Sequence, residues 1–103
     1  MYAMQKRADR IAAALGAAFA PSVLEVRDDS AAHVGHAGAR PEGETHFSVR
    51  LVSAAFAGLS RVERARAVHA ALGAELTTGL HALSLTLEAP EEHYREHHRE
   101  HHR

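Results

Sequence analysis

The sequence predicts one α+β domain, built as a two-layer sandwich of helices on a three-stranded mixed sheet. Two segments repeat apolar residues at the three- and four-residue steps of a helix, and three segments alternate apolar and polar residues as strands do. These segments follow one another in the order helix, strand, strand, helix, strand, and the second helical segment divides in two at a glycine. A chain of 103 residues is the size of one domain. The expected order is therefore α-β-β-α-α-β, with the helices on one face of the sheet.

The first predicted helix spans residues 4–20. Within it, Ala8, Ile11 and Leu15 recur at three- and four-residue steps and form an apolar stripe. Pro21 ends the helix, because a proline ring clashes with the preceding turn and offers no backbone N–H. We expect the stripe to face the sheet.

Two predicted strands follow, over residues 23–27 and 46–53, with a long loop over residues 28–44 between them. Apolar side chains alternate with polar ones in both strands, so each strand has one apolar face. The apolar positions are Leu24, Val26, Phe47, Val49 and Leu51. The loop holds three glycines and one proline. The two strands it joins are expected to pair antiparallel.

The second helical segment begins at Ser60, which fits a capping box with Glu63. Its predicted apolar stripe consists of Val62, Ala65, His69, Leu72 and Leu76. Gly73 divides the segment into two short helices. A third strand is predicted over residues 80–87, and the residues that share one of its faces are His81, Leu83, Leu85 and Leu87. Because this strand follows a helical crossover, it can pair in parallel with its neighbour.

The predicted domain covers residues 1–90, and residues 91–103 form a tail rich in histidine, arginine and glutamate. The tail has no apolar stripe, so we expect it to be exposed, either as a solvated helix with Glu–Arg pairs or as a disordered segment. In a helix, His93, His97 and His101 would be one turn apart, a spacing that suits Zn²⁺, Ni²⁺ or Cu²⁺. The alternative is a solvated tail of biased composition.

The composition excludes several classes of protein. The chain has no cysteine, which excludes a disulfide scaffold, a thiol catalyst and a cluster held by the chain's own thiolates. A formal net charge of −1 argues against a protein that coats nucleic acid. No apolar run approaches the length of a membrane span, and we expect a cytoplasmic protein. No nucleophile triad or phosphate-binding glycine loop is present, so we do not expect an enzyme.

Four segments and one loop resemble the BolA family in their order, in their spacing and in the residues of their motifs. The segments are LEVRDDS (24–30), GETHFSVRLVS (43–53), FAGLSRVERARAVHAAL (56–72) and GLHALSLTLEAPEE (79–92), and the loop is HVGHAGARPEG (33–43). The HAL triplet after the helical crossover and the ETHF start of the second strand are the most specific of these. The resemblance covers roughly residues 4–92. It implies a fold similar to the class II KH domain, which agrees with the predicted order of elements.

The resemblance also implies partners and a shared cofactor. BolA-like proteins bind monothiol glutaredoxins, and together the two hold a [2Fe–2S] cluster to which the glutaredoxin and glutathione supply thiolates and the BolA-like protein supplies histidine. This implies a role in cluster binding, iron sensing or cluster delivery. The matched motifs point to His81 and His46 as the ligands. Because the chain lacks cysteine, it needs the partner for this function, and alone it is expected to be a monomer or a weak homodimer.

The histidines also have simpler interpretations. Taken without the resemblance, His81 fits a partly buried histidine bonded to the backbone, and His46 fits an ordinary exposed one. His33 and His36, on the long loop, are candidate further ligands. His69 is expected to pack against the sheet from the second helix.

The second helix departs from the family pattern R-H-R-x-x-Y. Ala65 stands where the family has histidine, and His69 stands where it has an aromatic residue. The change at Ala65 puts in doubt any role of that family histidine in orienting a ligand or a partner.

A DNA-binding transcriptional regulator is the alternative function. The family is also described as regulators, and a basic patch could be formed by Arg50, Arg61, Arg64 and Arg66. On a chain of near-neutral charge, a solvated helix face explains the same residues. The chain also lacks, between its predicted helices, the G-x-x-G loop with which KH domains grip RNA. The cluster function is therefore the favoured prediction.

Overall fold

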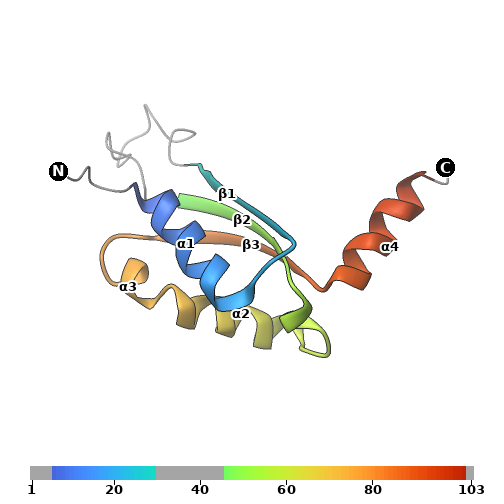
Figure 1. Cartoon of the computed structure of the whole chain (residues 1–103). Coiled ribbons are helices and arrows are strands. Elements are labelled where there is room, and N and C mark those ends of the chain that lie inside the picture. The colour runs from blue at the N-terminus through green and yellow to red at the C-terminus, as the bar shows by residue number, and fades with distance from the viewer. Residues whose placement is uncertain (1–5, 30–45, 102–103) are drawn as a thin grey trace.

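The computed structural model describes the backbone of residues 6–29 and 46–101, and the side chains of those residues as far as Arg95. In chain order the elements are α1 (Arg7–Phe19), β1 (Val23–Asp28), β2 (His46–Val52), the short 3-10 helix η2 (Ala54–Phe56), α2 (Arg61–Ala71), α3 (Gly73–Leu76), β3 (Ala82–Glu88) and α4 (Pro90–His101). Figure 1 shows α1, α2 and α3 on one side of the sheet, with α4 leading away from the end of β3. The predicted order α-β-β-α-α-β and the α+β fold class are confirmed.

The three strands form one mixed sheet in the order β1-β2-β3. The pairing of β1 with β2 is antiparallel, and that of β2 with β3 is parallel, as predicted. Val49 at the centre of β2 lies opposite Val26 of β1 and Leu85 of β3. Because residues in register share a face, these three side chains form one apolar row under the helices.

The core lies between this apolar face and the helices. Ile11 and Leu15 of α1 are fully buried, which confirms the stripe predicted for the first helix. The strand positions Phe47, Val49 and Leu51 are buried against them. Each such side chain contributes about 1.5–3 kcal/mol when it leaves water. The alternate positions of β3, Ala82, Ser84 and Thr86, are exposed, so the second face of this strand is not part of the core.

The capping box of the second helix is confirmed. The backbone N–H of Glu63 donates to Ser60 Oγ over 3.1 Å, and the backbone N–H of Ser60 donates to Glu63 Oε1 over 2.8 Å. A new helix, α3, begins at Gly73, so the predicted division at this glycine is also correct.

The apolar stripe predicted for the second helix is largely wrong, because Leu72 is the one buried residue among its five members. The residues of α2 that face the core are Arg64 and Val68, followed by Leu72 at its C-terminal cap. Val62 is 57% exposed and His69 is exposed, so His69 does not pack against the sheet. The helix is rich in alanine, which gives little contrast between its faces. Its buried face also includes a charged residue, which a search for apolar periodicity passes over.

The tail begins as a helix that is attached to the domain. Glu92 in the first turn of α4 accepts from Arg64 Nη1 over 2.7 Å and from the backbone N–H of Ala89 over 2.8 Å. His93 Nδ1 lies 3.1 Å from Glu88 Oε1. The tail therefore takes one of the two forms expected of it, a helix, and its first turn also contacts the domain, which the sequence does not predict. From residue 96 onward only the helical backbone of α4 is described.

Within residues 6–29 and 46–101, none of the helices is long and apolar enough to cross a membrane.

Candidate functional site

Two of the predicted ligand residues are at the same end of the sheet. His46 is the first residue of β2, and its partner in the parallel β3 is Ala82, the residue that follows His81. Neighbouring strands are about 5 Å apart, so His46, which begins β2, and His81, which directly precedes β3, lie at the same end of two adjacent strands. His46 is half-buried and His81 is exposed. The simpler interpretation of His81 as a partly buried residue therefore does not hold.

The backbone of His46 is held from the side of β1. The backbone N–H of Asp29 donates to the carbonyl oxygen of His46 over 2.8 Å, which continues the pairing of the two strands by one residue. The Asp29 carboxylate also forms an ion pair with Arg27 over 2.7 Å and accepts from the Ser48 hydroxyl. These contacts fix the point at which β2 begins, and thereby the backbone of the half-buried histidine.

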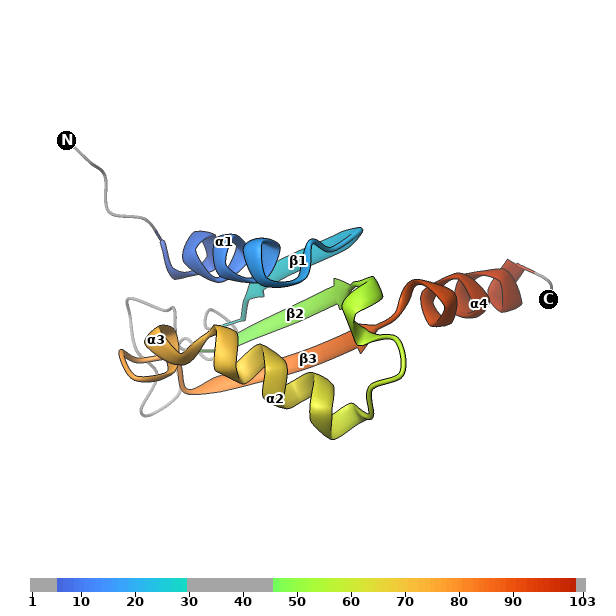
Figure 2. The ribbon, with the colours of Figure 1, turned by 60° about the horizontal axis from the view of Figure 1, so that its bottom comes forward.

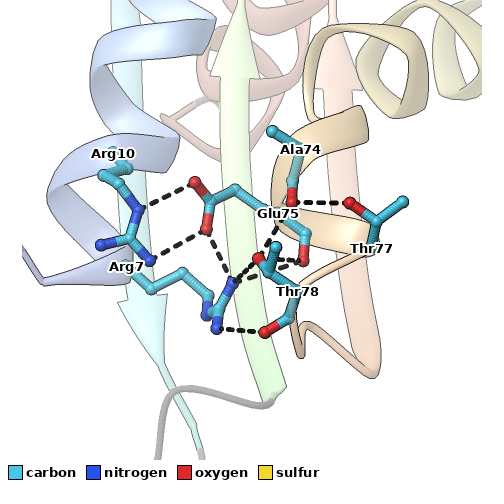
Figure 3. Close-up of polar contacts among 6 residues, drawn as sticks. All are labelled: Arg7, Arg10, Ala74, Glu75, Thr77 and Thr78. Atoms are coloured by element: carbon cyan, nitrogen blue, oxygen red, sulfur yellow. Dashed lines mark hydrogen bonds and ion pairs between the residues drawn. The ribbon is translucent and has the colours of Figure 1, made fainter.

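The connection that leads to His81 is held by a buried ion-pair cluster. Glu75 of α3 accepts from Arg7 Nη1 over 2.7 Å and from Arg10 Nε over 2.9 Å, and both arginines belong to α1 (Figure 3). The side chains of Arg7 and Glu75 are each only 11% exposed. The hydrogen bond from Arg10, together with the charges of both arginines, holds the pKa of Glu75 below its ordinary value.

Arg7 also fixes the turn between α3 and β3. Its Nη2 donates to the carbonyl oxygen of Thr78 over 3.1 Å, and its Nη1 lies 3.1 Å from Thr78 Oγ1 (Figure 3). Gly79 has a φ of +132°, and a Cβ built there would lie 3.0 Å from Arg7 Nη2. The turn therefore requires glycine at this position. Leu80, the residue after Gly79, is buried in the core, so the backbone is held in place up to the residue before His81.

The other candidate histidines do not join this pair in the part of the chain that the structure describes. His33 and His36 lie outside the described residues, as do the side chains of His97 and His101. His93 is bonded to Glu88 at the opposite end of β3. Among the described residues, no group of three or more histidine and acidic side chains is placed to hold a metal ion. Within the described residues, His46 and His81 are therefore at most two of the ligands that a metal site needs.

The four arginines of the predicted basic patch are not on one surface. Arg64 is only 8% exposed, and its guanidinium bonds to Glu92, to the carbonyl oxygens of Leu59 and Leu87, and lies over the Phe56 ring. Arg50 lies in β2, with Nε 3.8 Å from Glu25 Oε1. The arginines that are exposed on α2 are Arg61 and Arg66. Arg64 holds the structure together and is not available as a contact for DNA.

The ion-pair cluster around Glu75 was not foreseen from the sequence. Arg7 and Glu75 are 68 residues apart, and no local pattern connects them. The one local signal is the Thr-Thr-Gly run over residues 77–79, which indicates a turn but not the arginine that holds it.

Comparison with known proteins adds the family. Residues 15–92 match the family model described as BolA, a BolA-like protein. The chain is 44% identical over 92 residues to "Protein BOLA1, chloroplastic" of Arabidopsis thaliana, which covers 87% of this chain and 58% of that protein. It is 51% identical over 79 residues to "Uncharacterized protein in cobS 5'region" of Sinorhizobium sp, which covers 76% of this chain and 85% of that protein.

Solved structures agree with the fold. BolA1 from Arabidopsis thaliana superimposes with a TM-score of 0.77 at 42% identity, covering 87% of this chain and 98% of that one. BolA1 from Mus musculus superimposes with a TM-score of 0.73 at 39% identity, covering 94% of this chain and 75% of that one. The chain spans only 52% of the human BolA-like protein 1, to which it is 44% identical. The match of sequence, fold and element order leads to one conclusion: the chain belongs to the BolA family.

Proposed function

We propose that this BolA-like protein binds a [2Fe–2S] cluster jointly with a monothiol glutaredoxin and glutathione, and so serves in iron sensing or cluster delivery. The observation that supports this most is the register of β2 and β3, which brings His46 and His81 to one end of the sheet. Neutral imidazole is an established ligand of iron in [2Fe–2S] centres, where it replaces thiolate on one of the two irons.

The donor set on this chain fits half of such a site. Two imidazoles can serve one iron, and a chain without cysteine has no thiolate for the other. His81 is exposed, so a partner can approach it without unfolding the domain. In Figure 1 the starts of β2 and β3 are at the opposite end of the sheet from α4, which leaves α4 away from this approach. When bound, the cluster would supply a redox- and acid-sensitive iron centre to the complex.

The test is anaerobic reconstitution of the full chain with a monothiol glutaredoxin, glutathione, iron and sulfide. Visible absorption and circular dichroism would be recorded for the wild type, His81→Ala and His46→Ala. His69→Ala serves as the matched control, because His69 is an exposed histidine that lies on α2 and not on the two strands. We expect a spectrum distinct from that of the glutaredoxin homodimer, retained by His69→Ala and lost or shifted in the other two variants.

The proposal fails if the wild type leaves the glutaredoxin spectrum unchanged and the two proteins do not associate. It also fails if both His81→Ala and His46→Ala give the wild-type spectrum. The DNA-binding alternative has no support of comparable weight, because the structure removes Arg64 from the basic patch that it requires.

A further inference from the structure

The two edges of the sheet are protected to different degrees. β1 is one edge strand, and three of its six residues are charged, namely Glu25, Arg27 and Asp28. β3 is the other edge strand, and from Ala82 to Leu87 it has no charged residue, proline or glycine. Charges and prolines are the usual means by which proteins prevent an edge strand from pairing with another chain. The edge formed by β3 is therefore suited to accept a further strand.

The backbone groups on this edge can be assigned. The carbonyl oxygen of Glu88 accepts from the backbone N–H of Ser53, on the β2 side. Because backbone groups alternate along a strand, those of Leu83, Leu85 and Leu87 point away from β2. Arg64 Nη1 donates to the carbonyl oxygen of Leu87 over 3.2 Å. Among the described residues, none forms a hydrogen bond with the outward backbone groups of Leu83 or Leu85.

A groove runs beside this edge, between the first half of α2 and the second half of β3. Its volume is about 1090 Å³. Its apolar lining comes from Leu59, Val62, Ala65, Leu85 and Leu87. Val62, at 57% exposed, is the most exposed large aliphatic side chain among the described residues. The first two turns of α4 also line the groove, through Glu92 and Arg95. The groove therefore offers apolar contact along the same line as the open strand edge.

The charges in the groove are not evenly compensated. Arg64 pairs with Glu92, and Glu88 pairs with His93, so these groups are engaged within the domain. Arg61 and Arg95 also line the groove, and neither forms an ion pair within the described part of the chain. The charge of Arg95 contributes to lowering the pKa of Glu92, but Glu92 makes its direct contacts with Arg64. Two arginines are thus available to a bound molecule.

We propose that β3 and this groove bind an extended, acidic peptide segment of a partner protein, which pairs with β3 as a fourth strand. Its backbone would bond to the outward groups of Leu83 and Leu85, and alternate apolar side chains would enter the groove beside Val62. Its carboxylates would meet Arg61 and Arg95. Strand addition of this kind draws affinity from the backbone and specificity from alternate side chains. The groove lies beside the second half of β3, whereas the two histidines lie at the start of β2 and β3, and the proposal does not depend on the cluster.

Two other occupants fit the same surface less well. A nucleic acid strand has neither an amide backbone to pair with β3 nor aliphatic side chains to fill the apolar lining of the groove. A second copy of this chain, paired through β3, would bring Arg61 and Arg95 of both copies to the interface and would supply no further carboxylate to pair with them. The observations therefore favour an acidic peptide over both.

The test uses the full chain and a fluorescein-labelled hexapeptide of alternating glutamate and valine, with binding followed by anisotropy. A hexapeptide has the length of a typical strand. The double variant Arg61→Glu/Arg95→Glu should weaken binding by about tenfold or more. Arg66→Glu is the matched control, because Arg66 is an exposed arginine of α2 that does not line the groove. Circular dichroism of each variant would verify that it is folded.

The backbone pairing is tested on the peptide, without altering the protein. Two N-methylated versions of the hexapeptide block alternate amides on one side or on the other, and only one of the two should lose binding. The proposal is overturned if the wild type does not bind the hexapeptide, or if the double variant binds it as well as Arg66→Glu does. It is equally overturned if both N-methylated peptides bind like the parent, or if a single-stranded oligonucleotide binds in an Arg61-dependent manner while the peptide does not. Self-association of the wild type would also overturn the proposal, if it protects the backbone amides on the outer edge of β3 from exchange.

Discussion

At the residue scale, the carboxylate of Glu75 links α1 to the segment between α3 and β3, which carries His81. It accepts hydrogen bonds from two arginines of α1 in a place where its side chain is 11% exposed. A carboxylate in such a place is stable only while its partners remain, because a buried charge without a partner is costly. The position of His81 therefore depends on a contact between two distant parts of the chain.

Substitution of Glu75 should reveal this dependence. Glu75→Ala leaves Arg7 buried without its anion, and we expect the free energy of unfolding to fall by about 3–5 kcal/mol. Urea denaturation of the wild type and the variant measures this loss. Glu25→Ala is the control, because the Glu25 side chain is 72% exposed and its 3.8 Å pair with Arg50 should contribute less than about 1 kcal/mol. Equal losses in the two variants would contradict the role given to Glu75.

Gly79 is the second residue on which this connection depends. Its φ of +132° and the nearby Arg7 Nη2 leave no place for a side chain, so Gly79→Ala should destabilise the fold by about 1–3 kcal/mol. Gly16→Ala provides the opposite case, because a Cβ at this position of α1 meets nothing within 4 Å. Alanine there should stabilise by about 0.5–1 kcal/mol. Thermal unfolding of both variants gives the two signs, and a stabilising Gly79→Ala would refute the geometry.

At the element scale, Glu92 is one of the residues that attach α4 to the domain. Arg64 and the backbone of Ala89 lower the pKa of Glu92 to about 2. A carboxylate whose pKa is lower in the folded state stabilises that state above its ordinary pKa, and this stabilisation is lost as the pH falls towards the folded pKa. The contribution of Glu92 should therefore decline between about pH 5 and pH 2. Because the Glu92 side chain is 42% exposed, screening by solvent makes this contribution to stability smaller.

The measurement is the difference in unfolding free energy between the wild type and Glu92→Gln over this range of pH. We expect the difference to be largest near pH 6 and to vanish towards pH 2. Glu91→Gln, at the neighbouring exposed position of α4, should show no such trend. A difference that stays constant with pH would show that Glu92 does not anchor α4 through its charge.

The elements show how far the sequence leads. The strand alternation and the capping box at Ser60 are local patterns, so they predicted β2 and the start of α2 correctly. The buried face of α2 was predicted wrongly, because Arg64 occupies a core position and its partner Glu92 is 28 residues away. Local periodicity carries no information about such a distant partner. For the same reason the attachment of α4 was not foreseen.

At the scale of the whole molecule, the fold separates two surfaces. The starts of β2 and β3 bring the two histidines together at one end of the sheet, and α4 follows β3 at the other end (Figure 2). The resemblance to family motifs singles out His46 and His81, but only the register of the parallel strands shows that both are at the same end of the sheet. A glutaredoxin at the first end would leave the groove beside β3 accessible.

The central claim is that His46 and His81 supply nitrogen ligands to a cluster shared with a glutaredoxin. The most direct measurement is pulsed electron paramagnetic resonance of the reduced complex, prepared with this chain labelled with ¹⁵N at histidine and an unlabelled glutaredoxin. We expect strong ¹⁵N couplings from the labelled chain, which His81→Ala and His46→Ala each reduce and which His69→Ala leaves intact. A reduced cluster without any ¹⁵N coupling from this chain would contradict the claim.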